Sequence, residues 1–491
     1  MFIPAAALRI APVVNVYSTL VMIFSLTMAA PLIVAYIEGD TALVNYYEAI
    51  VITFVAGVLM RVLTMHRKRE LQARDGFLLV FLVWTILPAF ATLPLLLSLP
   101  ELSFTDAYFE TVSGITTTGS TVLDNIDALP SSINFWRCEL VWIGGMGLIV
   151  LAVAILPLLG VGGMQLYKAE TPGPMKDSKL TPRITETAKG LWFVYAGITV
   201  VCFIAYRLAG MSWFDAITHA FTTMGLGGFS THDRGYAFFD SPLIEAITVV
   251  FMLVSAINFA THFQAFRERS VRPYGIDPEA KAFLVVTLAS AGLIAWYLWM
   301  RGTYPDFMTA LRYGAFNTIS IATTTGYANT DYGLWPVFAP LWMLFLCCFA
   351  SSSGSTGGGI KMIRALLLVR QGLRELVRLI HPNAQVPVKL GGAVVPNQIV
   401  FAVLAFMSIY GACVIVMTFL LLATGLDALS AFTAVIASIN NTGPGLNEVG
   451  PARTFAGLTD FQTWVCTVAM LLGRLELFTL LVIFTPAFWR R

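Results

Sequence analysis

Ten apolar stretches, each long enough to cross a lipid bilayer as a helix, follow one another along this 491-residue chain. A helix needs about 20 apolar residues to cross the ~30 Å hydrocarbon core, and backbone at that depth must form its hydrogen bonds within the segment. The stretches predict ten membrane-spanning helices, near residues 13–37, 45–65, 77–99, 134–159, 187–209, 242–262, 281–301, 335–379, 395–424 and 462–489. The eighth stretch is too long for one span and is interrupted by glycines.

The composition agrees with a lipid environment. Apolar residues make up 57% of the chain and charged residues 12%, whereas soluble domains carry about 25% charged residues. A soluble chain this apolar would expose large apolar patches and aggregate. Disordered proteins, secreted disulfide scaffolds and nucleic-acid-binding proteins are therefore excluded. We expect a membrane protein whose surroundings are the lipid bilayer and which is not an enzyme, because candidate catalytic groups are lacking.

Lysine and arginine residues set the predicted orientation. Most of them lie near the N-terminus and in the segments that follow the even-numbered spans, including the C-terminal end. Because cytoplasmic loops carry the excess of Lys and Arg, we expect both termini in the cytoplasm.

Four segments on the predicted outer side repeat one pattern, aligned on Gly119, Gly228, Gly326 and Gly443. Each contains an apolar stretch too short to cross the membrane, followed by residues that tolerate unwound backbone. A small residue stands twelve positions before each glycine, and an acid stands five positions after it. These acids are Asp124, Asp233, Asp331 and Glu448. The pattern predicts four re-entrant loops, each between two spans.

The predicted fold is an all-α polytopic membrane protein with four pseudo-fourfold helix–re-entrant loop–helix repeats around a central pore. Two N-terminal spans precede the repeats in residues 1–70. The repeats are expected at residues 71–165, 166–265, 266–390 and 391–491, the third with a broken second helix. Unwound backbone at membrane depth must be enclosed or line a water-filled path.

Such loops would surround the pore with backbone carbonyl oxygens, which can replace the hydration shell of a monovalent cation. Glycine permits a positive φ and lets successive carbonyls turn toward the axis. The short helices would point their partially negative C-terminal ends at the ion. The four acids would form an outer ring that concentrates cations, although a solvated rim without effect on flux is the alternative.

The segments Thr116-Thr117-Thr118-Gly119, Gly227-Gly228-Phe229-Ser230, Thr323-Thr324-Thr325-Gly326 and Asn441-Thr442-Gly443-Pro444 carry a family resemblance, together with 160–167, 354–359 and Gly473-Arg474-Leu475-Glu476. They resemble the Trk/Ktr/HKT superfamily of potassium transporters, and within it the TrkH/TrkG family of bacterial potassium-uptake membrane subunits. The likeness covers nearly the whole chain.

The resemblance implies a potassium selectivity filter, a homodimer in which each protomer has its own pore, and a cytoplasmic nucleotide-binding regulatory subunit of the TrkA type. It also implies a bacterial inner-membrane location, with potassium as substrate and no organic cofactor in this chain. All four aligned positions are glycine, which favours potassium. The implied filter residues are Thr117, Thr118, Gly119, Leu226, Gly227, Gly228, Thr324, Thr325, Gly326, Asn441, Thr442 and Gly443.

The interruption of the eighth span is rich in glycine and serine and cannot form a stable continuous helix. In the family the matching segment blocks the pore beneath the filter and moves on opening. The implied gate consists of Ser351, Ser352, Ser353, Gly354, Ser355, Thr356, Gly357, Gly358, Gly359 and Arg474. The alternative for the loop is a small-residue face that lets helices pack closely.

Arg474 stands near the middle of the tenth predicted span, where a charge is costly unless it faces water or a partner. Family position implies that it points into the pore and repels cations. The alternative is a buried ion pair with Glu476 or with an acid elsewhere, although residues two apart do not share a helix face.

The leading functional hypothesis is gated potassium uptake driven by the membrane potential. The alternative is a proton- or sodium-coupled secondary symporter with alternating access. Such transporters usually show inverted repeats and mid-membrane acids, whereas these repeats have the same sense and their acids lie at the predicted mouth. The five histidines show no metal-ligand spacing.

Overall fold

The computed structural model describes residues 5–66, 69, 71–147 and 184–490, and within them the fold is almost entirely helical. Its strands in this part, β1 (Lys389–Leu390) and β2 (Ala393–Val394), form one antiparallel hairpin. The predicted all-α class is confirmed. The motif at 160–167 and the end of the fourth predicted span lie outside the described residues.

The helices fall into an N-terminal pair of spans and four groups. The N-terminal part contains α1 (Ala5–Thr27), α2 (Ala29–Glu38) and α3 (Leu43–Thr64). The first group contains α4 (Ala73–Thr85), α5 (Leu87–Ala91), α6 (Leu93–Ser98), α7 (Phe104–Ile115) and α8 (Ser131–Gly145). The second contains α11 (Ile184–Leu208), α12 (Trp213–Gly225), α13 (Pro242–Ser255) and α14 (Phe259–Glu268). The third contains α15 (Arg272–Ile276), α16 (Pro278–Met300), α17 (Phe307–Ala322), α18 (Phe338–Cys347) and α19 (Met362–Ile380). The fourth contains α20 (Asn397–Ala423), α21 (Ala428–Ile439), α22 (Asp460–Arg474), α23 (Phe478–Leu481) and α24 (Pro486–Trp489).

Six helical segments in the described part are long and apolar enough to cross a membrane, or eight if two bent pairs each count as one span. The eighth predicted span is broken between α18 and α19, as expected. The sixth and tenth are also not continuous helices, because the chain bends by 93° between α13 and α14 and by 106° after α22. At the second bend Glu476 and Leu477 have φ of 52° and 54°, a left-handed conformation in which a right-handed helix cannot continue.

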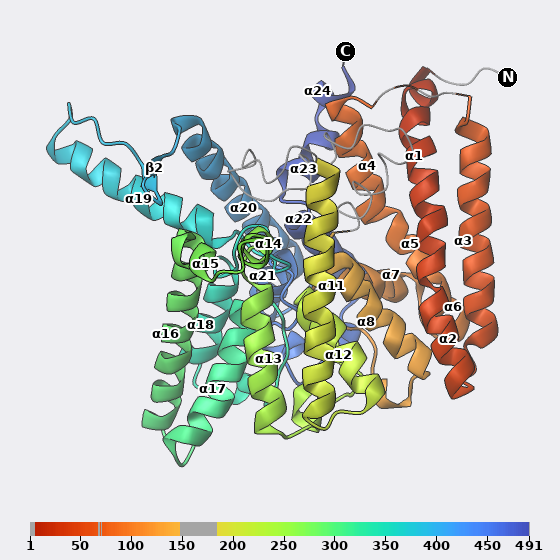
Figure 1. Cartoon of the computed structure of the whole chain (residues 1–491), viewed down its shortest axis with the longest axis horizontal. Coiled ribbons are helices and arrows are strands. Elements are labelled where there is room, and N and C mark those ends of the chain that lie inside the picture. The colour runs from red at the N-terminus through yellow and green to blue at the C-terminus, as the bar shows by residue number, and fades with distance from the viewer. Residues whose placement is uncertain (1–4, 67–68, 70, 148–183, 491) are drawn as a thin grey trace.

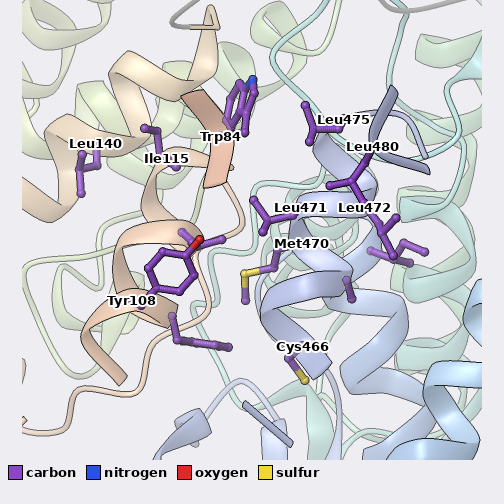
Figure 2. Close-up of a cluster of buried hydrophobic side chains, with 14 of the residues drawn as sticks. Trp84, Tyr108, Ile115, Leu140, Cys466, Met470, Leu471, Leu472, Leu475 and Leu480 are labelled. Atoms are coloured by element: carbon purple, nitrogen blue, oxygen red, sulfur yellow. The ribbon is translucent and has the colours of Figure 1, made fainter. Parts of the chain in front are cut away.

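The groups pack in a closed cycle. The helix that follows each short helix packs against the short helix of the next group: α8 against α12, α13 against α17, α18 against α21, and α22 against α7. The last pair joins the fourth group to the first. Figure 2 shows its core, with Tyr108 on one side and Met470 and Leu471 of α22 on the other. In Figure 1, α1 and α3 lie side by side at one edge and α19 extends from the opposite edge.

Candidate ion pathway

The four short helices α7, α12, α17 and α21 begin in the same way. A side-chain oxygen of the residue before each helix accepts a hydrogen bond from a backbone amide of the first turn, which replaces a missing intrahelical partner. The capping residues are Ser103, Ser212, Asp306 and Asp427. Each cap fixes where its helix starts, and hence where its other end lies.

The four helices also end alike. In each copy, the amide one residue before the aligned glycine donates to the carbonyl five residues earlier, at 2.8–3.0 Å. These amides belong to Thr118, Gly227, Thr325 and Thr442. The residue before each of them has φ between 53° and 61°: Thr117, Leu226, Thr324 and Asn441. The shared geometry turns the backbone out of the helix at the same point in every copy.

The residues that follow these turns meet in a ring. We call residues 117–119, 226–228, 324–326 and 441–443 the glycine segments. A Cβ on Gly119 would lie within 3.0 Å of the backbone of Gly228, and one on Gly228 would lie as close to Thr325. The same holds for Gly326 against Thr442 and for Gly443 against Thr118. The four segments therefore contact one another in cyclic order, and a side chain at any aligned glycine would push its neighbour away.

The conformational reason for glycine differs among the four positions. Gly119, Gly326 and Gly443 have φ of 82°, 86° and 102°, which glycine adopts without steric penalty. Gly228 is not among the residues of positive φ, so the expectation that φ explains all four glycines is wrong there. At Gly228 the close carbonyl of Thr325 is the constraint, 2.6 Å from where a Cβ would stand.

The Gly/Ser loop (residues 351–359) lies against the C-terminal ends of the short helices and is not helical. The Thr356 hydroxyl donates to the Met224 carbonyl at 3.0 Å, and the Gly358 amide donates to the Thr324 hydroxyl at 2.8 Å. A Cβ on Gly358 would collide with the carbonyl of Asn440. The loop thus contacts the ends of the second, third and fourth short helices.

Arg474 lies beside the remaining short helix. It ends α22 and is half-buried, rather than standing in mid-helix as expected. Its guanidinium donates to the Thr117 hydroxyl at 3.2 Å, to the Thr356 carbonyl at 3.0 Å and to the Gly144 carbonyl. Arg474 therefore joins the first glycine segment, the Gly/Ser loop and α8. The carboxylate of Glu476 lies 2.6 Å from Arg364.

Two residues that sequence reasoning did not select hold the Gly/Ser loop. The buried carboxylate of Glu279 accepts hydrogen bonds from the amide of Ser353 at 2.7 Å, within the loop, and from the amide of Ile363 at 3.0 Å, just after it. The Lys361 ammonium donates to the Gly357 carbonyl. Lys361 lies within the eighth predicted span, and its side chain is buried.

The four acids predicted to form an outer ring each have a hydrogen-bond or ion-pair partner. Asp124 accepts from the Thr454 hydroxyl, Asp233 accepts from the Ile126 amide, and Asp331 caps its own turn. Glu448 pairs with Arg453 at 2.6 Å. Three of the four are exposed, and Asp331 is half-buried. Their carboxylates thus stabilise the loops that follow the glycine segments.

His232 joins the loops of the first and second groups. Its ring nitrogens lie 2.6 Å from Asp127 and 3.1 Å from Asp215. Partial burial alone would lower the pKa of His232. The hydrogen bonds to the two carboxylates outweigh this effect, and the pKa of His232 is raised above its ordinary value. Although partial burial raises the pKa of both carboxyl groups, hydrogen bonds lower it by more. The bond from His232 lowers the pKa of Asp215 most, whereas the Asp233 backbone amide, followed by His232, lowers the pKa of Asp127.

This geometry predicts a pH-dependent stability. The folded-state pKa of His232 is raised, so its bonds to Asp127 and Asp215 stabilise the folded protein in a pH-dependent way. This stabilisation is fully present below the pKa of an unfolded histidine, ~6.5, and is lost as the pH rises through the folded-state pKa. We expect the melting temperature of the wild type to exceed that of His232→Gln at about pH 6 and the difference to shrink toward about pH 9. Thermal unfolding in detergent measures both, and a pH-independent difference would contradict the assignment.

Comparison with known proteins places the chain in a family. A family model for TrkH, described as a cation transport protein, matches residues 42–491. The chain is 48% identical to the Trk system potassium uptake protein TrkH of Halomonas elongata, over 98% of this chain and 99% of the relative. It is 45% identical to the TrkH of Escherichia coli K12, over 97% and 99% of the two chains. The crystal structure of the potassium transporter TrkH from Vibrio parahaemolyticus matches with a TM-score of 0.88 and 45% identity, covering 98% of this chain and 99% of that one. The chain therefore belongs to the TrkH family of cation transport proteins.

Proposed function

We propose that this protein takes up potassium as the membrane subunit of a Trk system in the bacterial inner membrane. The cyclic contact among the four glycine segments is the observation that carries the proposal. In this proposal the contact brings backbone carbonyls of one chain to a common centre, where they can substitute for the water around a dehydrated potassium ion. The names of the full-length relatives support the same substrate.

The glycine segments form the selectivity filter in this proposal. The helix ends beneath the segments add partial negative charge, and the exposed acids at the outer loops attract cations. Potassium is the substrate, and the chain needs no organic cofactor.

The Gly/Ser loop and Arg474 form the gate. Three of the four short-helix ends touch the loop and the first touches Arg474, so the loop and Arg474 together contact all four ends. Opening requires the bonds from Thr356 and Gly358 to break and the loop to move aside. The guanidinium also places a positive charge on the ion path, which repels cations.

We further propose a homodimer, a TrkA-type regulatory subunit on the cytoplasmic side and cytoplasmic termini. The Trk system in the relatives' names supports the additional subunit. The distribution of lysine and arginine supports the orientation.

Cation flux into liposomes that hold the purified protein tests this function. At 100 mV each charge gains ~2.3 kcal/mol, enough to drive accumulation without another energy source. We expect potassium uptake that follows an imposed voltage in the absence of proton and sodium gradients. Uptake that strictly requires either gradient would instead support the secondary symporter, which the same-sense packing of the four groups does not favour. Protein-free liposomes are the control.

A further inference from the structure

A buried ion pair lies behind the ring of glycine segments. Glu110 of α7 and Arg137 of α8 approach to 2.7 Å, and each side chain is 1% exposed. An isolated charge at such depth is very costly, and even a paired one must form hydrogen bonds on all sides to be tolerated. The partners of this pair therefore indicate which parts of the molecule it holds.

Those partners are the chain segments that leave the first and second glycine segments. The Glu110 carboxylate accepts hydrogen bonds from the Thr121 hydroxyl and the Val122 amide, each at 3.0 Å. The Arg137 guanidinium donates to the Ser230 carbonyl at 3.3 Å and lies 4.4 Å from the centre of the Phe229 ring. One ion pair thus joins two adjacent quadrants just beyond Gly119 and Gly228.

The position of Glu110 recurs in the other copies with different chemistry. Nine residues before the aligned glycines stand Glu110, His219, Asn317 and Ala434. The His219 ring bonds the Ser230 hydroxyl at 3.0 Å, and the Asn317 amide donates to Asn329 at 2.6 Å. In the fourth copy, the residue before Ala434 forms the corresponding contact. The Thr433 hydroxyl accepts a hydrogen bond from the Leu446 amide at 3.0 Å. Every short helix therefore holds the outgoing chain two or three residues beyond its glycine.

We propose that the Glu110–Arg137 pair positions the first two glycine segments and thereby sets the discrimination between potassium and sodium. The inference rests on the proposed function. Discrimination requires either carbonyls at distances that suit one ion or a fixed number of coordinating carbonyls. Both conditions depend on segments that do not move. Among the four links at this aligned position, the first is the one built on an ion pair in the described residues, and it couples two quadrants. Glu110 and Arg137 are positioning residues and touch no ion.

The test compares Glu110→Gln with a matched control, Glu245→Gln. Glutamine keeps the shape of Glu110 but removes the charge. Glu245 is also buried and pairs with Arg312 at 2.8 Å, but its partner lies away from the glycine segments. We expect the potassium-to-sodium permeability ratio in liposomes to fall by about tenfold in Glu110→Gln, equivalent to ~1.4 kcal/mol, and to stay unchanged in Glu245→Gln.

A double variant keeps the inference testable if Glu110→Gln does not fold. Glu110→Gln with Arg137→Gln leaves no unpaired buried charge, so we expect it to fold and to show a lower ratio than the wild type. If Glu110→Gln, Arg137→Gln and the double variant all fold, the fall in the potassium-to-sodium ratio can be compared as a free energy. We expect the fall in the double variant to be smaller than the sum of the falls in the two single variants. A folded Glu110→Gln or double variant with the wild-type ratio, or strictly additive losses, would overturn the inference. A wild type without selective potassium flux would show that the proposed function itself has failed.

Discussion

Replacing Arg474 by alanine is expected to raise the resting potassium flux by at least about tenfold. Two unit charges 4 Å apart repel by about 4 kcal/mol at an effective dielectric constant of 20, so removal of the guanidinium lowers a large barrier on the ion path. The substitution also removes the hydrogen bonds from Arg474 to Thr117 and Thr356. Both losses favour an open path, and flux into liposomes at a fixed voltage measures the sum.

Arg474→Lys separates the two contributions. Lysine keeps the charge but cannot reproduce the planar fork of donors that reaches Thr117, Thr356 and Gly144 together. Low flux in Arg474→Lys would assign closure to the charge, and high flux would assign it to the hydrogen bonds. Arg370→Ala, an exposed position on α19, is the control for loss of an arginine. Wild-type resting flux in a folded Arg474→Ala would contradict the gate.

The glycine segments could be predicted from sequence because their constraints are local. Short apolar stretches, threonine or asparagine before three of the four glycines, and the regular spacing already indicate a helix that ends in unwound backbone. In the structure the same features appear as the shared turns at Thr117, Leu226, Thr324 and Asn441. The break in the eighth span was also predictable, since its glycines and serines disfavour a helix wherever they are placed.

Features that depend on distant partners were not predictable. In the sequence Glu279 is an ordinary acid just before the seventh predicted span, and its role follows from amides 74 and 84 residues further along the chain. Arg137 stands near the start of the fourth predicted span, and it is buried because Glu110 stands opposite. The apolar residues that continue beyond Arg474 predict a position near the middle of a span, whereas the chain turns at Glu476 and Leu477. Hydropathy reports burial, but it does not report which buried polar groups meet.

Changing Gly119 to serine is expected to reduce the potassium-to-sodium permeability ratio by about tenfold. Gly119 has φ of 82°, and its Cβ position lies within 3.0 Å of the Gly228 backbone. A serine therefore adds backbone strain of roughly 1–3 kcal/mol and must push the first and second glycine segments apart. Since an ion is recognised by carbonyls at fixed positions, the displaced segments should accept sodium more readily.

Gly425→Ser is the matched control for this prediction. Gly425 has φ of 89°, but nothing lies within 4 Å of its Cβ position. The control variant therefore carries similar backbone strain without a neighbour to displace, and we expect it to lower the melting temperature while keeping the wild-type ratio. Bi-ionic flux measurements on both variants separate loss of stability from loss of selectivity. An unchanged ratio in a folded Gly119→Ser would mean that the ring of glycine segments does not discriminate between the ions, and the filter would have to be sought elsewhere along the path.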